Sequence, residues 1–186
     1  MEGPIDITDL EMPQWVCSTR IENQNANFAV VRIDTIRRFC PDGTMELPMR
    51  IDSLHHLALT VTDLERSRRF YLETLGLREI PRPPFSFPGA WFAVGETGQQ
   101  LHLIVHTRST FRDGKPLDTR DVHFAFRVPS YAGAVEFLRA RGYRDGISGD
   151  DPLRMILHPH AVAGFPQIYI LDPDRHVIEI NAATLD

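Results

Sequence analysis

The chain has 186 residues, of which 42% are hydrophobic and 24% are charged, and its formal net charge is −5. These values are typical of a soluble globular protein and argue against a disordered or fibrous chain. The acidic balance and the lack of a Lys/Arg-rich block argue against nucleic acid as a partner. No apolar run approaches the roughly 20 residues that a bilayer crossing needs, so we expect no membrane partner.

The start of the chain and its cysteines indicate the compartment. Met1 and the residues after it lack the basic and then apolar pattern of a secretory signal. Cys17 and Cys40 are more simply explained as free thiols than as a disulfide. We therefore expect a cytoplasmic location.

The first 50 residues differ in pattern from the rest. Gln, Asn, Asp and Pro interrupt every apolar run except residues 28–33, which we interpret as one strand. Residues 41–44 have turn chemistry. We expect residues 1–50 to be an N-terminal extension that packs on the main domain, residues 51–186, or on a partner subunit.

An internal repeat begins at residue 53. Residues 54–61 alternate as a half-buried strand does, and Thr62 and Glu65 then have the spacing of a capping box. This pattern predicts a helix that starts here and ends at Gly76, where a left-handed cap is expected.

The second copy repeats the same pattern. Residues 121–128 alternate again, Ser130 is a suitable N-cap, and Gly142 is placed to end the helix. Each helix is followed by three more strand candidates, at 77–80, 90–94 and 100–105 and then at 154–158, 167–171 and 176–181. We predict an α+β fold in which two βαβββ modules, residues 53–106 and 121–182, form a curved mixed sheet around a metal-binding cleft.

Strand parity selects the candidate metal ligands. Side chains in a strand alternate between faces, and four strands each place one ligand-type side chain opposite their bulkiest residues. These are His56, His102, His123 and Glu179. A single strand histidine is more often a hydrogen-bonded core residue than a ligand. However, Glu179 stands in an apolar run, where a carboxylate needs a cation or several donors.

The four residues come from the first and last strands of both copies, which pseudo-two-fold symmetry would bring together. Three imidazoles and one carboxylate suit one divalent ion such as Zn, Ni, Co, Mn or Fe. If the ion is six-coordinate, two positions stay open for water or for two adjacent substrate oxygens. Open positions are typical of a catalytic rather than a structural site.

Several segments carry a family resemblance. They are His55-His56-Leu-Ala-Leu-Thr-Val with the predicted helix of residues 63–77, Phe87-Pro-Gly-Ala-Trp-Phe with Leu101-His-Leu, Val122-His-Phe-Ala-Phe, and Ile168-Tyr-Ile-Leu-Asp-Pro-Asp-Arg-His-Val-Ile-Glu-Ile. On these segments, residues 53–182 resemble the vicinal oxygen chelate superfamily of glyoxalases, bleomycin-resistance proteins and dioxygenases. The resemblance implies that the four ligand candidates bind the metal, and that the protein is a glyoxalase-like lyase or isomerase whose small substrate chelates the metal through adjacent oxygens. It also implies a possible homodimer.

One ligand position departs from the glyoxalase I pattern, which usually has a carboxylate or amide where this chain has His102. Glu179 is then the one carboxylate among the ligands and our candidate for catalytic proton transfer. Three alternatives remain open: an Fe(II) extradiol-type dioxygenase with His102 as a bystander, a fosfomycin-type thiol transferase, and a ligand-sequestering protein of the same fold without turnover.

Four further residues are candidates for substrate binding. Arg127 shares the face of His123 and suits a substrate carboxylate or phosphate, although a salt bridge would explain it equally well. Phe87 and Trp91 suit an apolar pocket wall or the core. His160 lies in a loop that could overhang the cleft, or it is an ordinary surface histidine.

Overall fold

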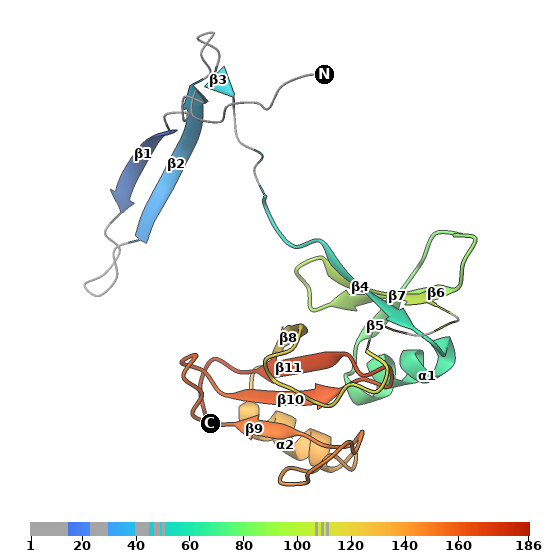
Figure 1. Ribbon diagram of the computed structural model, residues 1–186. Coiled ribbons are helices and arrows are strands. Elements are labelled where there is room, and N and C mark those ends of the chain that lie inside the picture. The colour runs from blue at the N-terminus through green and yellow to red at the C-terminus, as the bar shows by residue number, and fades with distance from the viewer. Residues whose placement is uncertain are drawn as a thin grey trace, which may run out of the picture. The chain divides into compact units, whose positions relative to one another are not determined.

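The computed structural model describes residues 15–22, 30–39, 45–46, 49, 51–106, 108, 110 and 112–186. The chain divides into two compact units, Met1–Ser53 and Leu54–Asp186. Figure 1 traces both units from the N-terminus to the C-terminus. Among the described residues, no helix combines the length and the apolar character needed to cross a membrane.

The first unit contains a three-stranded antiparallel sheet. Its strands are β1 (Trp15–Glu22), β2 (Val30–Phe39) and β3 (Met45–Glu46), in the order β1-β2-β3. The sequence predicted one strand at 28–33, of which residues 28 and 29 lie outside the described residues, as does the expected turn. That prediction missed β1, because its Ser, Thr, Arg and Glu residues hide a strand that backbone pairing with β2 reveals.

The first module of the second unit has four strands and one helical segment. They are β4 (His56–Val61), α1 (Leu64–Arg69) followed by the π-helical turn η2 (Phe70–Thr74), β5 (Arg78–Ile80), β6 (Gly89–Val94) and β7 (Gln99–Val105). The sheet order is β4-β7-β6-β5, with β4 and β7 parallel and the other pairs antiparallel. As predicted, the helical segment ends at a left-handed glycine, Gly76 (φ 68°).

The second module repeats this arrangement. It contains β8 (His123–Arg127), α2 (Tyr131–Arg139), β9 (Ile156–His158), β10 (Gln167–Leu171) and β11 (Val177–Asn181), with the sheet order β8-β11-β10-β9. The α+β fold with two βαβββ modules is therefore confirmed. The strands form two open four-stranded mixed sheets, and β4 and β8 are edge strands of their sheets (Figure 1).

The two helices start differently from each other. Ser130 caps α2 as predicted, because its Oγ accepts a hydrogen bond from the Gly133 amide at 2.9 Å. The expected capping box at Thr62 is wrong: Asp63 caps α1 by accepting from the Arg66 amide at 3.0 Å. The Thr62 hydroxyl is occupied elsewhere, since it donates to Asp174 at 2.6 Å.

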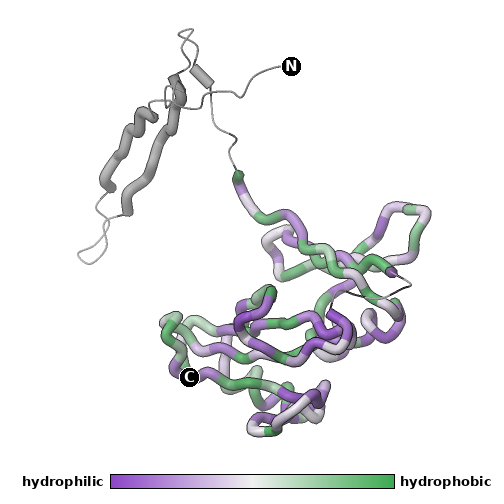
Figure 2. The backbone as a smooth tube through the Cα atoms, viewed as in Figure 1, coloured by the Kyte–Doolittle hydropathy of each residue, from purple (hydrophilic) through white to green (hydrophobic). Residues whose placement is uncertain are grey.

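One hydrophobic core joins the two modules. Its buried members from the first module include Val61, Tyr71 and Phe92, and those from the second include Leu138, Ile168 and Ile178. Hydrophobic and hydrophilic segments alternate along the chain of this unit (Figure 2), as expected for strands with one face on the core.

A polar contact reinforces this junction. Asp174, in the turn between β10 and β11, accepts hydrogen bonds from the amide and hydroxyl of Thr62 and from the hydroxyl of Ser67 at 2.9 Å. It also pairs with Arg66 at 3.0 Å. Asp172 in the same turn accepts from the Tyr71 hydroxyl at 2.7 Å. The turn thereby fixes the start of α1 on the second module.

Candidate metal centre

The first module brings His56 and His102 together. The strand register places Ala58 beside His102 and His56 beside Gln100, so both histidines lie on the same face of the β4–β7 pair. Their ring centroids are 4.4 Å apart, with an angle of 15° between the ring planes. His102 is 7% exposed, whereas His56 lies on the exposed edge strand.

The near-parallel stack limits how these two rings can act. The lone pair of an imidazole nitrogen points along the plane of its ring, and two stacked planes do not meet near the rings. One ion therefore cannot lie in both planes in this arrangement. This geometry favours His56 or His102 as a ligand, but not both.

The environment of His102 keeps its imidazole neutral. Burial and the neighbouring rings of His56 and His55 lower its pKa. The Gln100 side-chain oxygen lies 2.8 Å from Nε2, so Nε2 carries the hydrogen and Nδ1 has the lone pair. The indole of Trp91 stacks on the other side of His102, with centroids 4.1 Å apart and planes 6° apart.

The second module brings His123 and Glu179 together. His123 Nε2 lies 3.4 Å from Glu179 Oε2, close to the roughly 3 Å that separates two ligands of one ion. His123 Nδ1 lies 2.7 Å from the backbone oxygen of Asp121. A carbonyl only accepts, so Nδ1 donates to it and Nε2 faces the carboxylate. Histidine ligands of metals commonly have such a carbonyl on their other nitrogen.

Hydrogen bonds from neighbouring side chains hold the Glu179 carboxylate, which is 5% exposed. The Tyr169 hydroxyl donates to Oε2 at 2.8 Å, and the Asn181 amide donates to Oε1 at 2.6 Å. Burial alone would raise the pKa of Glu179. The hydrogen bonds from Asn181, Tyr169 and Gln167, together with the nearby His123, outweigh that effect, so the pKa falls below its ordinary value. Glu179 is therefore a stable carboxylate even without a cation.

Within the described ranges, no three side chains of the His, Cys, Asp and Glu types gather closely enough to hold a metal ion. The four predicted ligands instead form one pair on each sheet, His56 with His102 and His123 with Glu179. Each pair lies on the first and last strands of its module, as parity predicts. The complete four-residue set stays a prediction.

His160 lines a cavity of about 620 Å³ beside the second pair. The polar members of its wall are Thr119, His158, Gln167 and Tyr169. Because the Tyr169 hydroxyl bonds Glu179, this cavity adjoins the carboxylate. Among the residues that the structure describes, no acidic side chain lines this cavity, so it suits a polar or anionic part of a ligand.

The other three candidates lie on both modules. The Arg127 guanidinium stands 4.9 Å from the Phe165 ring, and the residue lines a mainly apolar cavity of about 450 Å³ between the modules. Trp91 stacks on His102. Phe87 lies in the loop between β5 and β6 and is 40% exposed.

The sequence interpretation missed three residues that position the ligands. Tyr169 pairs with Glu179 across β10 and β11, and Asn181 lies two residues along from it, so parity could have indicated both. His55 precedes β4, and its Nδ1 lies 2.9 Å from His56 Nδ1. Adjacent strand residues are expected on opposite faces, so the alternation gives no signal for this contact.

Two repeated βαβββ modules, each with a four-stranded mixed sheet and a helix, define the class of small α+β proteins to which this chain belongs. The chain belongs to the Glyoxalase/Bleomycin resistance protein/Dioxygenase superfamily, whose family model matches residues 53–180.

Individual relatives are distant. A Bacillus subtilis (strain 168) protein, the uncharacterized YwkD, is 26% identical over 134 residues, which span 71% of this chain and 98% of that protein. A glyoxalase family protein from Bacillus anthracis is 25% identical with a TM-score of 0.56, and the match covers 73% of this chain and 98% of that one. The fosfomycin resistance protein FosX from Listeria monocytogenes, solved with Mn(II), is 21% identical with a TM-score of 0.52 over 73% of this chain and 95% of that one. At that identity the last likeness shows the fold alone.

Proposed function

We propose that the chain is a metal-dependent, glyoxalase-like lyase or isomerase whose small substrate binds through two adjacent oxygens. The observation that carries this proposal is the second pair: His123 Nε2 faces Glu179 Oε2 at 3.4 Å, with Nδ1 held by the Asp121 carbonyl at 2.7 Å. Two nitrogen and oxygen donors in this orientation suit a divalent ion. Membership of a superfamily that includes metal-containing proteins such as FosX supports the same proposal.

The proposed ligands are His56, His123 and Glu179, with His102 beside them. The parallel stack of His56 and His102 separates their ring planes, and His56 is the more exposed of the two. Three protein ligands leave open positions for substrate oxygens, as catalytic sites require. The donor set suits Zn, Ni, Co, Mn and Fe alike and does not select one of them.

The site is proposed to form between two copies of the chain. In one copy the two pairs lie on separate sheets, and no group of three is assembled within the part of the chain that the structure describes. Edge strands β4 and β8 carry His56 and His123 respectively. In a homodimer, the first module of one copy would meet the second module of the other and complete the ligand set.

His102 is the proposed base. A bound divalent ion would stabilise negative charge on the adjacent substrate oxygens. Both oxygens of Glu179 already accept hydrogen bonds from Tyr169 and Asn181, which hold the carboxylate in its proposed ligand position. His102 is neutral and has its Nδ1 lone pair available, so it would accept the substrate proton in place of Glu179.

A second candidate function is an Fe(II) extradiol-type dioxygenase. The specific observation that favours it is again the stack, because His102 as a bystander leaves two histidines and one carboxylate. That set is typical of non-haem Fe(II) oxygenases. Two further alternatives are a fosfomycin-type thiol transferase and a ligand-sequestering protein. The same experiment distinguishes all four functions.

The test begins with elemental analysis of protein purified without added metal. The loaded protein is then assayed with thiol adducts of 2-oxoaldehydes, with epoxides plus a thiol, and with catechols in an oxygen electrode. The lyase or isomerase proposal expects turnover without oxygen uptake, and at least about 100-fold loss in His102→Gln. Iron with oxygen uptake on catechols would establish the dioxygenase instead, and tight ligand binding without metal or turnover would establish sequestration.

A further inference from the structure

Arg112 is a buried arginine in the segment that connects the two modules. It is 7% exposed, although arginine is among the residue types found least often inside a protein. Its Nη1 donates to the Asp121 carboxylate, and its Nε donates to the backbone oxygen of Arg175 at 2.9 Å. Because the guanidinium is planar and rigid, an arginine with two such acceptors holds them in a fixed relation to each other.

The two acceptors stand directly before the strands that carry the second ligand pair. Asp121 lies two residues before His123, the first residue of β8, and Arg175 lies two residues before the start of β11. The two strands are parallel neighbours in the sheet. Arg112 therefore bridges the starts of the strands that carry His123 and Glu179.

Asp121 connects this bridge to the His123 ring. Its Oδ1 accepts a hydrogen bond from the Val122 amide at 2.7 Å, while its Oδ2 accepts from Arg112. With both carboxylate oxygens engaged, one of them by a charged donor, Asp121 is held in one orientation. Its carbonyl is thereby directed at His123 Nδ1, 2.7 Å away, and the other ring nitrogen, Nε2, faces Glu179 at 3.4 Å.

The Arg175 end of the bridge has a strained backbone. Arg175 has φ 68°, in the left-handed region that residues other than glycine rarely adopt. Its amide donates to the Asp172 carbonyl at 3.0 Å, its own carbonyl accepts from Arg112, and its guanidinium pairs with Asp150. A strained conformation persists where surrounding contacts hold it, and such positions cluster at functional sites.

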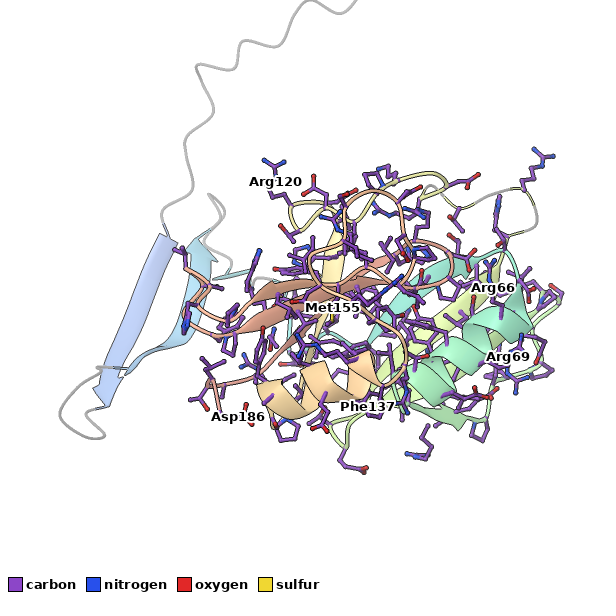
Figure 3. All side chains as sticks on the ribbon, turned by 90° about the horizontal axis from the view of Figure 1, so that it is seen from below. Arg66, Arg69, Arg120, Phe137, Met155 and Asp186 are labelled. Atoms are coloured by element: carbon purple, nitrogen blue, oxygen red, sulfur yellow. The ribbon has the colours of Figure 1, made fainter. Side chains whose placement is uncertain are left out.

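Lys115 and Arg120 also lie near Asp121, but neither forms such a bridge. Lys115 Nζ lies 3.8 Å from the Asp121 carboxylate, and its side chain is 51% exposed. Arg120 is adjacent to Asp121 in the chain, but its side chain is 89% exposed and extends into solvent (Figure 3), where it pairs with Asp118 at 3.4 Å. Solvent screens such exposed pairs, and long side chains move freely there, so neither cation can fix a carbonyl.

We propose that Arg112 is a positioning residue for the second ligand pair: through Asp121 it holds the ring of His123 in the orientation that directs Nε2 toward the metal site. The consequence for metal binding rests on the proposed function, whereas the hydrogen bond between Asp121 and His123 does not need the ion. Groups that orient a metal ligand in this way typically change metal affinity by about 10- to 100-fold when they are lost.

Proton exchange at the His123 ring tests the proposal in chelator-treated protein, where no metal contributes. The Nδ1–H signal in a nitrogen-15 NMR spectrum of histidine-labelled protein is assigned by its loss in His123→Ala. We expect Arg112→Met to speed the exchange of this proton with solvent by about 10-fold, because the Asp121 carbonyl is then free to turn away. Arg120→Met is the matched control, since it removes an exposed guanidinium from the same loop and should leave the exchange unchanged.

Chelator competition with zinc measures the consequence for the ligand pair. We expect zinc to bind about 10-fold more weakly to Arg112→Met than to wild type, and with unchanged affinity to Arg120→Met. Arg112→Lys covers the case in which Arg112→Met does not fold. It keeps a charge for Asp121, but an ammonium group lacks the planar fork that reaches both acceptors, so both effects should persist in the same direction.

Unchanged Nδ1–H exchange in the folded Arg112 variants, or an equal change in Arg120→Met, overturns the proposal. Faster exchange with wild-type zinc affinity does the same. If the protein takes up no zinc yet the exchange depends on Arg112, the proposed function fails and the positioning role stands. If wild type binds zinc and the Arg112 variants match it in both measurements, the positioning role fails and the proposed function stands.

Discussion

At the scale of residues, the proposed ligands His123 and Glu179 are each oriented by hydrogen bonds with neighbouring groups. The Asp121 carbonyl fixes the tautomer of His123, and Asp121 is itself held through its carboxylate by the buried Arg112. Tyr169 and Asn181 fix the two oxygens of Glu179. The alternation of side chains along each strand predicted which candidate ligands share a face, because alternation is a local property of the sequence. It could not indicate the stack of His56 on His102, which depends on side-chain rotation within the β4–β7 pair.

Replacing Tyr169 with Phe tests the support of the carboxylate. The change removes the hydroxyl that donates to Glu179 Oε2 and keeps the ring, which contacts His123 edge to face at 5.6 Å. Because outer groups orient metal ligands, we expect metal binding about 10-fold weaker in a chelator competition. Tyr131→Phe is the control, since the buried Tyr131 hydroxyl has no hydrogen-bond partner in the described part of the chain. Equal losses in both variants would contradict a specific role for Tyr169.

At the scale of elements, the order of strands and helices along the chain could be predicted because each module repeats one pattern of alternation, caps and glycines. The helix start was misplaced because Thr62 looks like a cap in sequence, while its hydroxyl is used by Asp174 more than 100 residues away. The pairing of β1 with β2 was missed for a similar reason, since backbone hydrogen bonds have no hydrophobic signature. Contacts between distant segments decide both cases.

The turn at Asp174 predicts a pH-dependent stability. Burial raises the pKa of Asp174, but the hydrogen bonds from Thr62 and Ser67 and the charge of Arg66 together lower it below its ordinary 3.8. A carboxyl with a depressed folded pKa stabilises the fold above its unfolded pKa, and this contribution is lost as pH falls through the folded pKa. Asp174→Asn should therefore cost about 2 kcal/mol of unfolding free energy at pH 7.

Urea unfolding at several pH values measures this effect. The difference between wild type and Asp174→Asn should be constant from pH 7 to about pH 5 and should shrink below about pH 4. The exposed pair of Asp118 with Arg120 provides the control, because solvent screens an exposed ion pair and Asp118→Asn should leave the unfolding free energy nearly unchanged. A difference for Asp174→Asn that persists unchanged into acid would rule out its carboxylate as the cause.

At the scale of the whole molecule, the fold class was predictable from the repeat, but the assembly was not. Each chain has its two pairs of candidate ligands on two separate four-stranded sheets. The alternation within a module does not indicate whether the second module of the same chain or that of another copy completes the site. In the proposed dimer, the surfaces of edge strands β4 and β8 would decide this, and those surfaces depend on the tertiary packing of the modules.

Mixed dimers test whether the site forms between copies. His56→Ala affects the first module and His123→Ala the second, so a mixed dimer of the two would contain one intact site. We expect mixing, with exchange checked by native mass spectrometry, to restore about one ion per mixed dimer. His123→Ala mixed with Glu179→Ala is the control, because every site then has a defective second module. Recovery in neither mixture would place the site within one chain.

The most direct test of the central claim is the metal content of protein purified without added metal, with His123→Ala and His176→Ala measured in parallel. His176 Nε2 lies 2.8 Å from the Thr60 carbonyl, to which it donates, and it is not a proposed ligand. We expect about one divalent ion per chain in wild type and in His176→Ala, and a background level in His123→Ala. Wild-type metal content in His123→Ala would contradict it.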